Sequence, residues 1–147
     1  MAEKDNMKNI SMLLLALLVF ISIQAQTKEE RRIRTAMNEQ MTAWNAGNMN
    51  RYMNTYWKSD SLMFIGKSGV TYGWDNTLKN YQKGYPDTAA MGKLDFELIN
   101  LKRLSGRYYS VVGKWHLKRT AGDLKGAFTL IFEKIKNRWV IVQDHSS

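Results

Sequence analysis

The chain has 147 residues, which allows a single domain with one hydrophobic core. Hydrophobic residues make up 44% of it and there is one proline, which excludes a disordered protein; the absence of cysteine excludes disulfides, thiolate catalysis, zinc–sulfur sites and a lipid-modified cysteine anchor. The net charge of +9 raises the question of nucleic-acid binding, but lysine and arginine are scattered along the chain, so we predict a solvated basic surface and no nucleic-acid partner.

The first 25 residues carry a targeting pattern. Lys8 supplies a positive charge, an apolar run of about 12 residues extends from Met12 to Ile23, and Ala25 is a small residue suited to cleavage. The run is too short for a bilayer, which needs about 20 residues. We therefore predict a signal peptide with a short upstream extension over residues 1–25, a domain over 26–147, and a periplasmic or secreted location without membrane attachment after cleavage. A retained N-terminal anchor is the alternative.

Helical periodicity dominates the first half of the predicted domain. Apolar side chains recur at helical spacing from Ile33 to Trp44, with Gln40 or Met41 on the same face, and Gly47 follows as a C-cap. Pro86 stops a later helix. The predicted elements are a helix from Thr27 to Trp44, a short helix over Arg51–Trp57 capped by Asn48 or Asn50, short strands over Leu62–Ile65 and Val70–Tyr72, and a helix from Gly73 to Tyr85.

From Lys93 the apolar period changes from 3.6 to 2, which indicates four antiparallel strands up to the end of the chain. Helices followed by strands predict the α+β class. We expect three N-terminal helices packed on the concave face of a strongly bent, mainly antiparallel sheet that forms a cone-shaped barrel.

The last two strands read as a hairpin. A three-residue loop over Lys136–Arg138 sets the predicted register, and a two-residue turn would exchange the partners. The predicted pairs on one face are Leu130 with Asp144, Phe132 with Val142 and Phe128 with Ser146; Trp139, Ile141, Gln143 and His145 point to the other face.

Asp144 is the candidate acid or base, because it shares the apolar face of Leu130. The alternative is a rim aspartate bonded to a tyrosine or an arginine. Seven large aromatics fall on inward faces, and four of them are tyrosines whose hydroxyl groups need partners, so we predict a partly open cavity, with space beside Gly113. Ordinary core packing is the alternative for each of these aromatics: Trp44, Tyr56, Tyr72, Trp74, Tyr81, Tyr85 and Trp115.

The other chemistry-bearing patterns are weak. His116 and His145 lie on the face away from Trp115 without a placed carboxylate, so we predict no metal site. Asp144 and His145 are strand neighbours that point to opposite faces, which prevents a Ser–His–Asp triad. The chain has no glycine-rich phosphate loop or nucleotide fingerprint, and we predict no cofactor.

Four motifs together resemble a known family: Trp44-Asn45-Ala46-Gly47-Asn48, Tyr56-Trp57, Tyr72-Gly73-Trp74, and Trp-x-Ile-x-x-Asp-His-x-Ser over Trp139–Ser147. Residues 28–147 are similar to the SnoaL-like and ketosteroid-isomerase-like branch of the nuclear transport factor two-like superfamily, which has a cystatin-like cone fold. The resemblance implies a pocket between the concave sheet face and the helices, and frequent dimerisation through the opposite face. It implies no single activity, because this scaffold hosts isomerases, cyclases, dehydratases, hydrolases and non-catalytic domains.

One departure from the family matters for activity. The general base of ketosteroid isomerases corresponds to Phe64, which cannot take a proton, so ketosteroid isomerase activity is not expected. Cyclases of the family use an acidic residue in the distal strands, and Asp144 is the matching candidate. Three functions stay open: binding of a small apolar or aromatic molecule by Trp44, Tyr56, Tyr72, Trp74, Tyr81, Trp115, Leu130 and Asp144; cyclase, isomerase or dehydratase chemistry by Asp144 with Tyr56 or Tyr81; and a homodimeric interaction module with a vestigial pocket.

Overall fold

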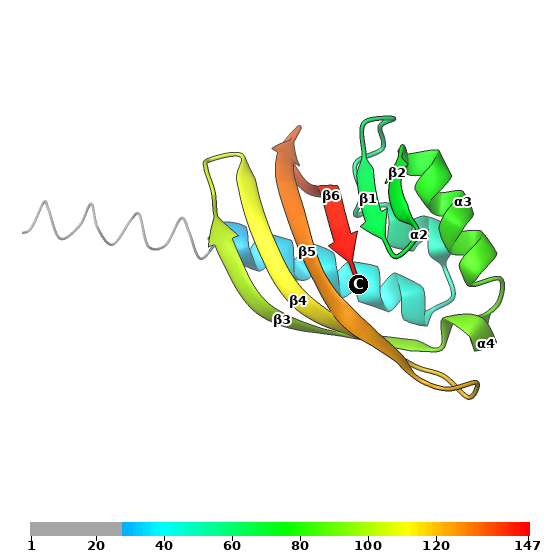
Figure 1. Ribbon diagram of the computed structural model, residues 1–147. Coiled ribbons are helices and arrows are strands. Elements are labelled where there is room, and N and C mark those ends of the chain that lie inside the picture. Colours follow the sequence, from blue (N-terminus) through cyan, green and yellow to red (C-terminus); the bar gives the residue numbers. More distant parts are fainter. Residues whose placement is uncertain (1–27) are drawn as a thin grey trace, which may run out of the picture. The chain divides into compact units, whose positions relative to one another are not determined.

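A computed structural model describes residues 28–147 (Figure 1). The predicted signal peptide and its upstream extension lie outside these residues. Residues 33–147 form one compact unit, and the description below concerns that unit. Within the described residues no helix is long and apolar enough to cross a membrane.

The order of elements follows the sequence-based prediction with one addition. The first helix covers residues 28–45 of the described chain. It is followed by α2 (Met49–Met53), β1 (Met63–Gly66), β2 (Gly69–Tyr72), α3 (Trp74–Gly84), α4 (Thr88–Met91), β3 (Lys93–Arg103), β4 (Tyr108–Lys118), β5 (Leu124–Ile135) and β6 (Arg138–Ser146).

Local chemistry accounts for the helix boundaries. Gly47, at φ 72°, follows the first helix in the left-handed region that glycine tolerates. Asn48 then caps α2 by accepting a hydrogen bond from the Arg51 amide at 2.9 Å, which decides between the two predicted caps. The unpredicted α4 is only four residues long, too short for a periodic signal, and Asp87 caps it through the Ala90 amide at 2.7 Å.

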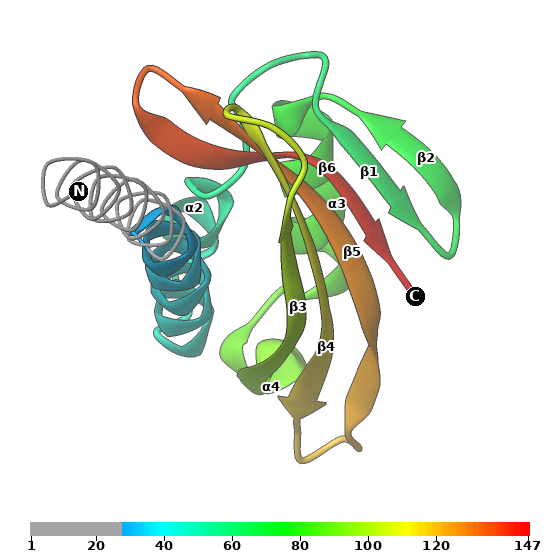
Figure 2. The same ribbon diagram turned by 90° about the vertical axis from the view of Figure 1, so that its left-hand side faces the viewer.

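Six strands form one sheet in the order β2-β1-β6-β5-β4-β3. The four strands β3 to β6 pair with their neighbours in an antiparallel manner, as predicted, and β1 pairs with β6 in parallel. Helices cover one face of this mixed sheet (Figures 1 and 2). The α+β class is therefore confirmed. The structure does not show a closed or strongly curled sheet, since β2 and β3 are both edge strands.

The hairpin of β5 and β6 corrects the predicted loop. Lys136 and Asn137, at φ 46° and 61°, form a two-residue turn, and Ile135 pairs with Arg138. Two successive positive φ angles suit the right-handed twist of a hairpin, so the tight turn is preferred to the predicted three-residue loop. Near the turn the register is therefore shifted by one residue.

An irregularity at Val142 then restores the predicted register. Phe132 pairs with Ile141 rather than with Val142, but Leu130 pairs with Asp144 and Phe128 with Ser146, as predicted. The extra residue of a β-bulge reverses which side chains face the core on either side of it. Trp139 and Ile141, predicted to face outward, are consequently core residues that are 6% and 0% exposed.

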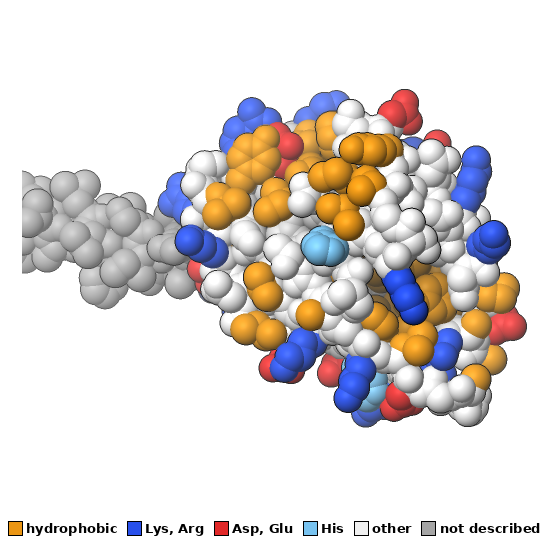
Figure 3. Space-filling view, viewed as in Figure 1, with side chains coloured by type: hydrophobic (Ala, Val, Ile, Leu, Met, Phe, Trp, Pro, Cys, Tyr) orange, Lys and Arg blue, Asp and Glu red, His pale blue; other side chains and the backbone are white. Residues whose placement is uncertain are grey.

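The two faces of the sheet differ in composition. The inner face carries buried apolar side chains such as Tyr109, Val111 and Leu130, which pack with the stripe of the first helix that contains Ile33 and Met37. Apolar side chains also gather on the outer face over β1 and β2 (Figure 3). Exposed large apolar residues of the described chain are Val70, Tyr72, Ile99, Leu104, Tyr108 and Leu124.

Candidate functional site

Asp144 lies on the inner face of the sheet. Its strand β6 is flanked by β1 and β5, so that Asp144 pairs with Phe64 on one side and with Leu130 on the other. The residue is only 3% exposed. This position is interior, as expected for the apolar face of Leu130, and the alternative of a rim aspartate does not apply.

Two hydroxyl groups donate to the Asp144 carboxylate. The Tyr56 hydroxyl lies 2.7 Å from Oδ2, and the Ser146 hydroxyl lies 2.6 Å from Oδ1. The Tyr81 hydroxyl lies 3.3 Å from the hydroxyls of both Tyr56 and Tyr52. These contacts form a hydrogen-bonded chain of three tyrosines that ends on a carboxylate.

Burial sets the protonation chemistry of this chain. Desolvation raises the pKa of Asp144 to about 6, although the hydrogen bonds from Ser146 and Tyr56 and the nearby His145 act in the opposite direction. Desolvation, and then the Asp144 charge, holds the pKa of Tyr56 well above 10. Asp144 can thus exchange a proton near neutral pH, while Tyr56 stays a neutral donor.

Aromatic rings surround the tyrosine chain. The Trp44 ring lies edge-on to Tyr52 at 4.9 Å, to Tyr81 at 6.0 Å and to Tyr85 at 4.9 Å between centroids. Phe64 lies edge-on to Tyr81 at 5.7 Å. Among the sequence candidates, the structure therefore brings together Trp44, Tyr56, Tyr81, Tyr85, Leu130 and Asp144.

Three candidates lie elsewhere. Tyr72 is 61% exposed on edge strand β2, on the outer face, so its predicted inward position is wrong. The Trp74 indole is partly buried; it donates to the Met53 carbonyl at 2.9 Å and lies under the Lys58 ammonium. Trp115 is on β4, paired with Gly126 rather than near Asp144.

The space predicted beside Gly113 is filled. A Cβ atom built on Gly113 would come within 2.4 Å of the Phe128 ring and 2.6 Å of the Glu97 carbonyl. Glycine at this position lets Phe128 pack across the sheet. It does not open a cavity next to Trp115.

Sequence reasoning omitted Tyr52 and Ser146 from the site. The signals were present, because Tyr52 is one helical turn before Tyr56 and Ser146 is on the same strand face as Asp144. Gln40 was also omitted. It is 1% exposed within the apolar stripe of the first helix. Within residues 28–147, the Gln40 Nε2 and the Trp115 Nε1 are buried donors without a hydrogen-bond partner.

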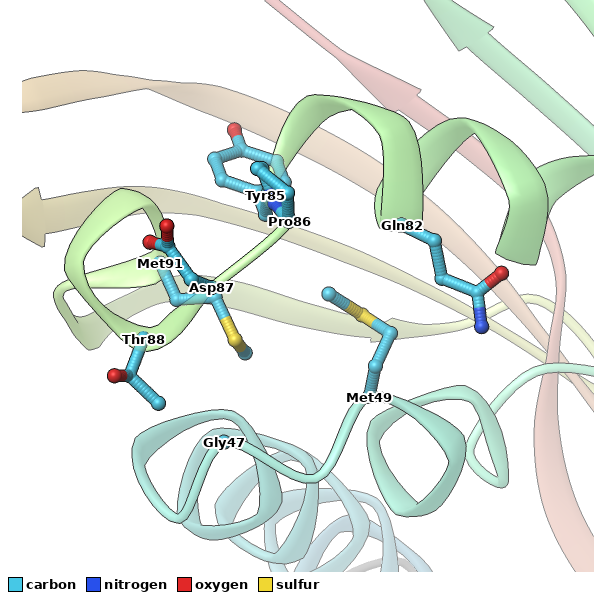
Figure 4. Close-up of a pocket in the computed structure, with 8 residues that line it drawn as sticks. All are labelled: Gly47, Met49, Gln82, Tyr85, Pro86, Asp87, Thr88 and Met91. Atoms are coloured by element: carbon cyan, nitrogen blue, oxygen red, sulfur yellow. The ribbon is translucent and has the colours of Figure 1, made fainter.

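A pocket of about 430 Å³ lies at the C-terminal end of α3, next to the turn that carries Tyr81 (Figure 4). It is an open pocket bordered by the segment after the first helix, the end of α3 and α4. Its lining residues are Gly47, Met49, Gln82, Tyr85, Pro86, Asp87, Thr88 and Met91. Tyr85 connects the two regions, because its ring also contacts Trp44 and stacks near Tyr81.

The histidines are on the outer side of the sheet. His116 Nε2 lies 3.0 Å from Asp123 Oδ2, a partner that the sequence did not indicate, and His145 is exposed. In the part of the chain that the structure describes, no group of three or more His, Cys, Asp or Glu side chains could hold a metal ion.

Comparisons with known proteins agree on the fold. Residues 33–147 match the SnoaL-like domain. An NTF-2-like protein of unknown function from Shewanella oneidensis MR-1 is 43% identical over 81% of this chain and 98% of its own, with a TM-score of 0.78. A ketosteroid isomerase-like protein from Erwinia carotovora atroseptica SCRI1043 is 16% identical over 80% of this chain and 93% of its own, with a TM-score of 0.62, a likeness of fold alone. No curated protein matches the chain.

Proposed function

Because the chain belongs to the SnoaL-like domain family, whose scaffold commonly encloses a pocket, we propose that it binds a small apolar or aromatic molecule against the Asp144–Tyr56 pair. The molecule lies between the helices and the inner face of the sheet. The observation that carries this proposal is a carboxylate only 3% exposed among aromatic rings, with a tyrosine hydroxyl 2.7 Å away.

Two unpartnered donors on core-facing surfaces, one of them away from Asp144, support a bound molecule between the helices and the sheet. A buried donor without a partner costs about 1–3 kcal/mol. The Gln40 amide and the Trp115 indole both belong to surfaces that face the core, namely the apolar stripe of the first helix and the inner face of β4. A ligand that carries a hydrogen-bond acceptor on an apolar body would satisfy one of them. The ligand is therefore expected to be mainly apolar with one acceptor oxygen or nitrogen.

A thermal-shift screen of apolar and aromatic compounds, each with one acceptor, tests this proposal. We expect at least one compound to raise the melting temperature of the wild-type protein and to do so less in Tyr56→Phe. Tyr72→Phe is the matched control, because it removes the same hydroxyl from an exposed tyrosine. Equal responses of the two variants, or no stabilising compound at all, would count against a site at Tyr56.

Acid–base catalysis is a second candidate, favoured by the pKa of about 6 at Asp144. Asp144 pairs with Phe64, the position that corresponds to the base of ketosteroid isomerases, so a carboxylate stands on the strand next to that position. It would remove a proton from the substrate and return it, as a cyclase, isomerase or dehydratase requires, while Tyr56 or Tyr81 donates to the developing oxyanion. Chromatography and NMR of each screening hit after incubation would reveal conversion by the wild type, isomerisation included, and Asp144→Asn should abolish it. Hits that stay unconverted favour binding alone.

Partner and location are also proposals. Export to the periplasm or beyond rests on the pattern in residues 1–25. N-terminal sequencing of exported protein should find a chain that begins after Ala25.

A homodimer through the outer face is favoured by Val70 and Tyr72, which are 52% and 61% exposed on one strand. Light scattering at micromolar concentration tests it, and a monomer would argue against the interaction module.

A further inference from the structure

Two methionine side chains line the pocket at the end of α3. Met49 and Met91 extend into it from opposite sides, from α2 and α4, as Figure 4 shows. Met91 is 4% exposed and Met49 is partly buried against the core. Tyr85 and Pro86 add an aromatic and an alicyclic ring. Thioethers are polarisable and adapt their shape to aromatic rings, with which they make favourable contacts of about 0.3–1.5 kcal/mol.

One acidic and one basic side chain lie near the pocket, and each is hydrogen-bonded to backbone groups. Asp87 is the charged residue of the lining, and its carboxylate caps α4 through the Ala90 amide. Arg119 is close enough to Tyr85 to oppose the rise in the Tyr85 pKa that burial causes. Its guanidinium already donates to the carbonyls of Gly122 and Ala90. With one anion and one cation nearby, the pocket presents no excess of either charge to a ligand.

We propose that this pocket is a second ligand site, separate from Asp144, which takes a small uncharged aromatic molecule between the Met49 and Met91 thioethers. The volume of about 430 Å³ is within the range of about 300–1,000 Å³ in which small molecules bind. Neither Asp144 nor the tyrosines that bond to it line the pocket. The site thus goes beyond the proposed function.

Methyl NMR of the full chain labelled with 13C at the methionine methyl groups tests the proposal directly. Benzyl alcohol is the probe, and Met49→Leu and Met91→Leu assign the two signals. We expect ring-current shifts at Met49 and Met91 that saturate, while Met53, which is fully buried in the core, is unaffected. Shifts spread over Met53 as well, or none at either lining methionine, would overturn the proposal.

Three analogues of the probe examine ligand class. Cyclohexylmethanol has the same size without the aromatic ring, and we expect benzyl alcohol to bind at least about twofold more tightly. Benzoate and benzylamine keep the ring but add a negative or a positive charge, and both should bind more weakly than benzyl alcohol. Equal affinity for the saturated alcohol, or tighter binding of either ion, would contradict the proposed ligand class.

Matched variants locate the site. Gln82→Trp fills the pocket from α3 and should abolish the shifts, whereas Lys83→Trp adds the same ring at the next exposed position, outside the lining, and should preserve them. Asp144→Asn should also preserve them. Loss of the shifts in Asp144→Asn would place the probe at the Asp144 site and refute a separate pocket, whereas their preservation leaves the proposed function to its own test with Tyr56→Phe.

Discussion

The Asp144 cluster and the pocket at the end of α3 differ in how polar groups and solvent are arranged. The cluster holds a carboxylate that is 3% exposed and surrounds it with hydroxyl donors from Tyr56 and Ser146. The pocket is lined by thioethers and rings together with the polar side chains of Gln82, Asp87 and Thr88, and the Asp87 carboxylate is bonded to backbone. Polar groups are enclosed in the first region, and apolar groups are left accessible in the second.

This difference predicts how each region responds to substitution. A buried carboxylate is costly unless hydrogen bonds compensate for the lost hydration, so the cluster depends on every donor around it. An open apolar pocket has no such dependence, because its polar neighbours are bonded elsewhere. Substitutions should therefore have large, pH-dependent effects in the cluster and small effects at the exposed positions of the pocket.

The largest expected effect is the pH dependence that Asp144 brings to stability. Its pKa is about 6 in the folded protein and about 3.9 in an unfolded chain, so the folded state binds the proton more tightly. Between these values the folded protein holds more protons, and stability decreases as the pH rises. Two pKa units correspond to about 3 kcal/mol. Asp144→Asn, which mimics the protonated acid, should therefore gain about 3 kcal/mol relative to the wild type between pH 4 and pH 7.

Urea unfolding of both proteins at several pH values measures this difference. The two proteins differ only at residue 144, so the difference between their curves reports on that carboxyl group and its neighbours. Burial raises the pKa of Tyr52, Tyr56 and Tyr81, so these tyrosines stay neutral over the range. Parallel curves for the two proteins would mean that Asp144 is hydrated, and the contrast between cluster and pocket would fail.

A smaller effect distinguishes the members of the tyrosine chain. Tyr56→Phe removes a donor at 2.7 Å from a charged acceptor and should cost about 1.5–3 kcal/mol at pH 7. It should also raise the pKa of Asp144 further, since this bond lowers it. Tyr81→Phe, the matched control, loses two contacts of 3.3 Å between neutral hydroxyls and should cost about 0.5–1.5 kcal/mol. Chemical denaturation gives both costs, and the reverse order would show that Tyr81 rather than Tyr56 anchors the chain.

The sequence predicted the fold better than it predicted turn geometry. Period-2 alternation identified β3 to β6, because alternation is a direct consequence of one buried face. The β5–β6 turn and the bulge at Val142 were missed, since the backbone angles of Lys136 and Asn137 and a single extra residue leave no apolar pattern. The two errors offset each other, which is why the pair of Leu130 and Asp144 was correct.

Site prediction succeeded where periodicity fixes direction. Tyr81 is on the predicted face of α3 and Asp144 is on the predicted face of β6, and both reach the cluster. The predicted inward position of Tyr72 was wrong because this residue is on an edge strand, where an aromatic side chain can face solvent as readily as the core. The pocket could not be predicted, because α4 and the loop around Gly47 create it by tertiary arrangement, and four residues of helix carry no periodic signal.

The smallest expected effect belongs to the pocket. Gln82 lines it from α3, and its side chain is exposed, so Gln82→Ala removes no core packing and should change the free energy of unfolding by less than about 0.5 kcal/mol. Met53→Ala is a contrasting control, since this fully buried methionine should cost about 2–5 kcal/mol. Urea unfolding of both variants at pH 7 gives the comparison. A cost above about 1 kcal/mol for Gln82→Ala would mean that the exposed α3 wall of the pocket belongs to the cooperative core, as Met91 does. The two regions would then differ in polarity but not in their tolerance to substitution.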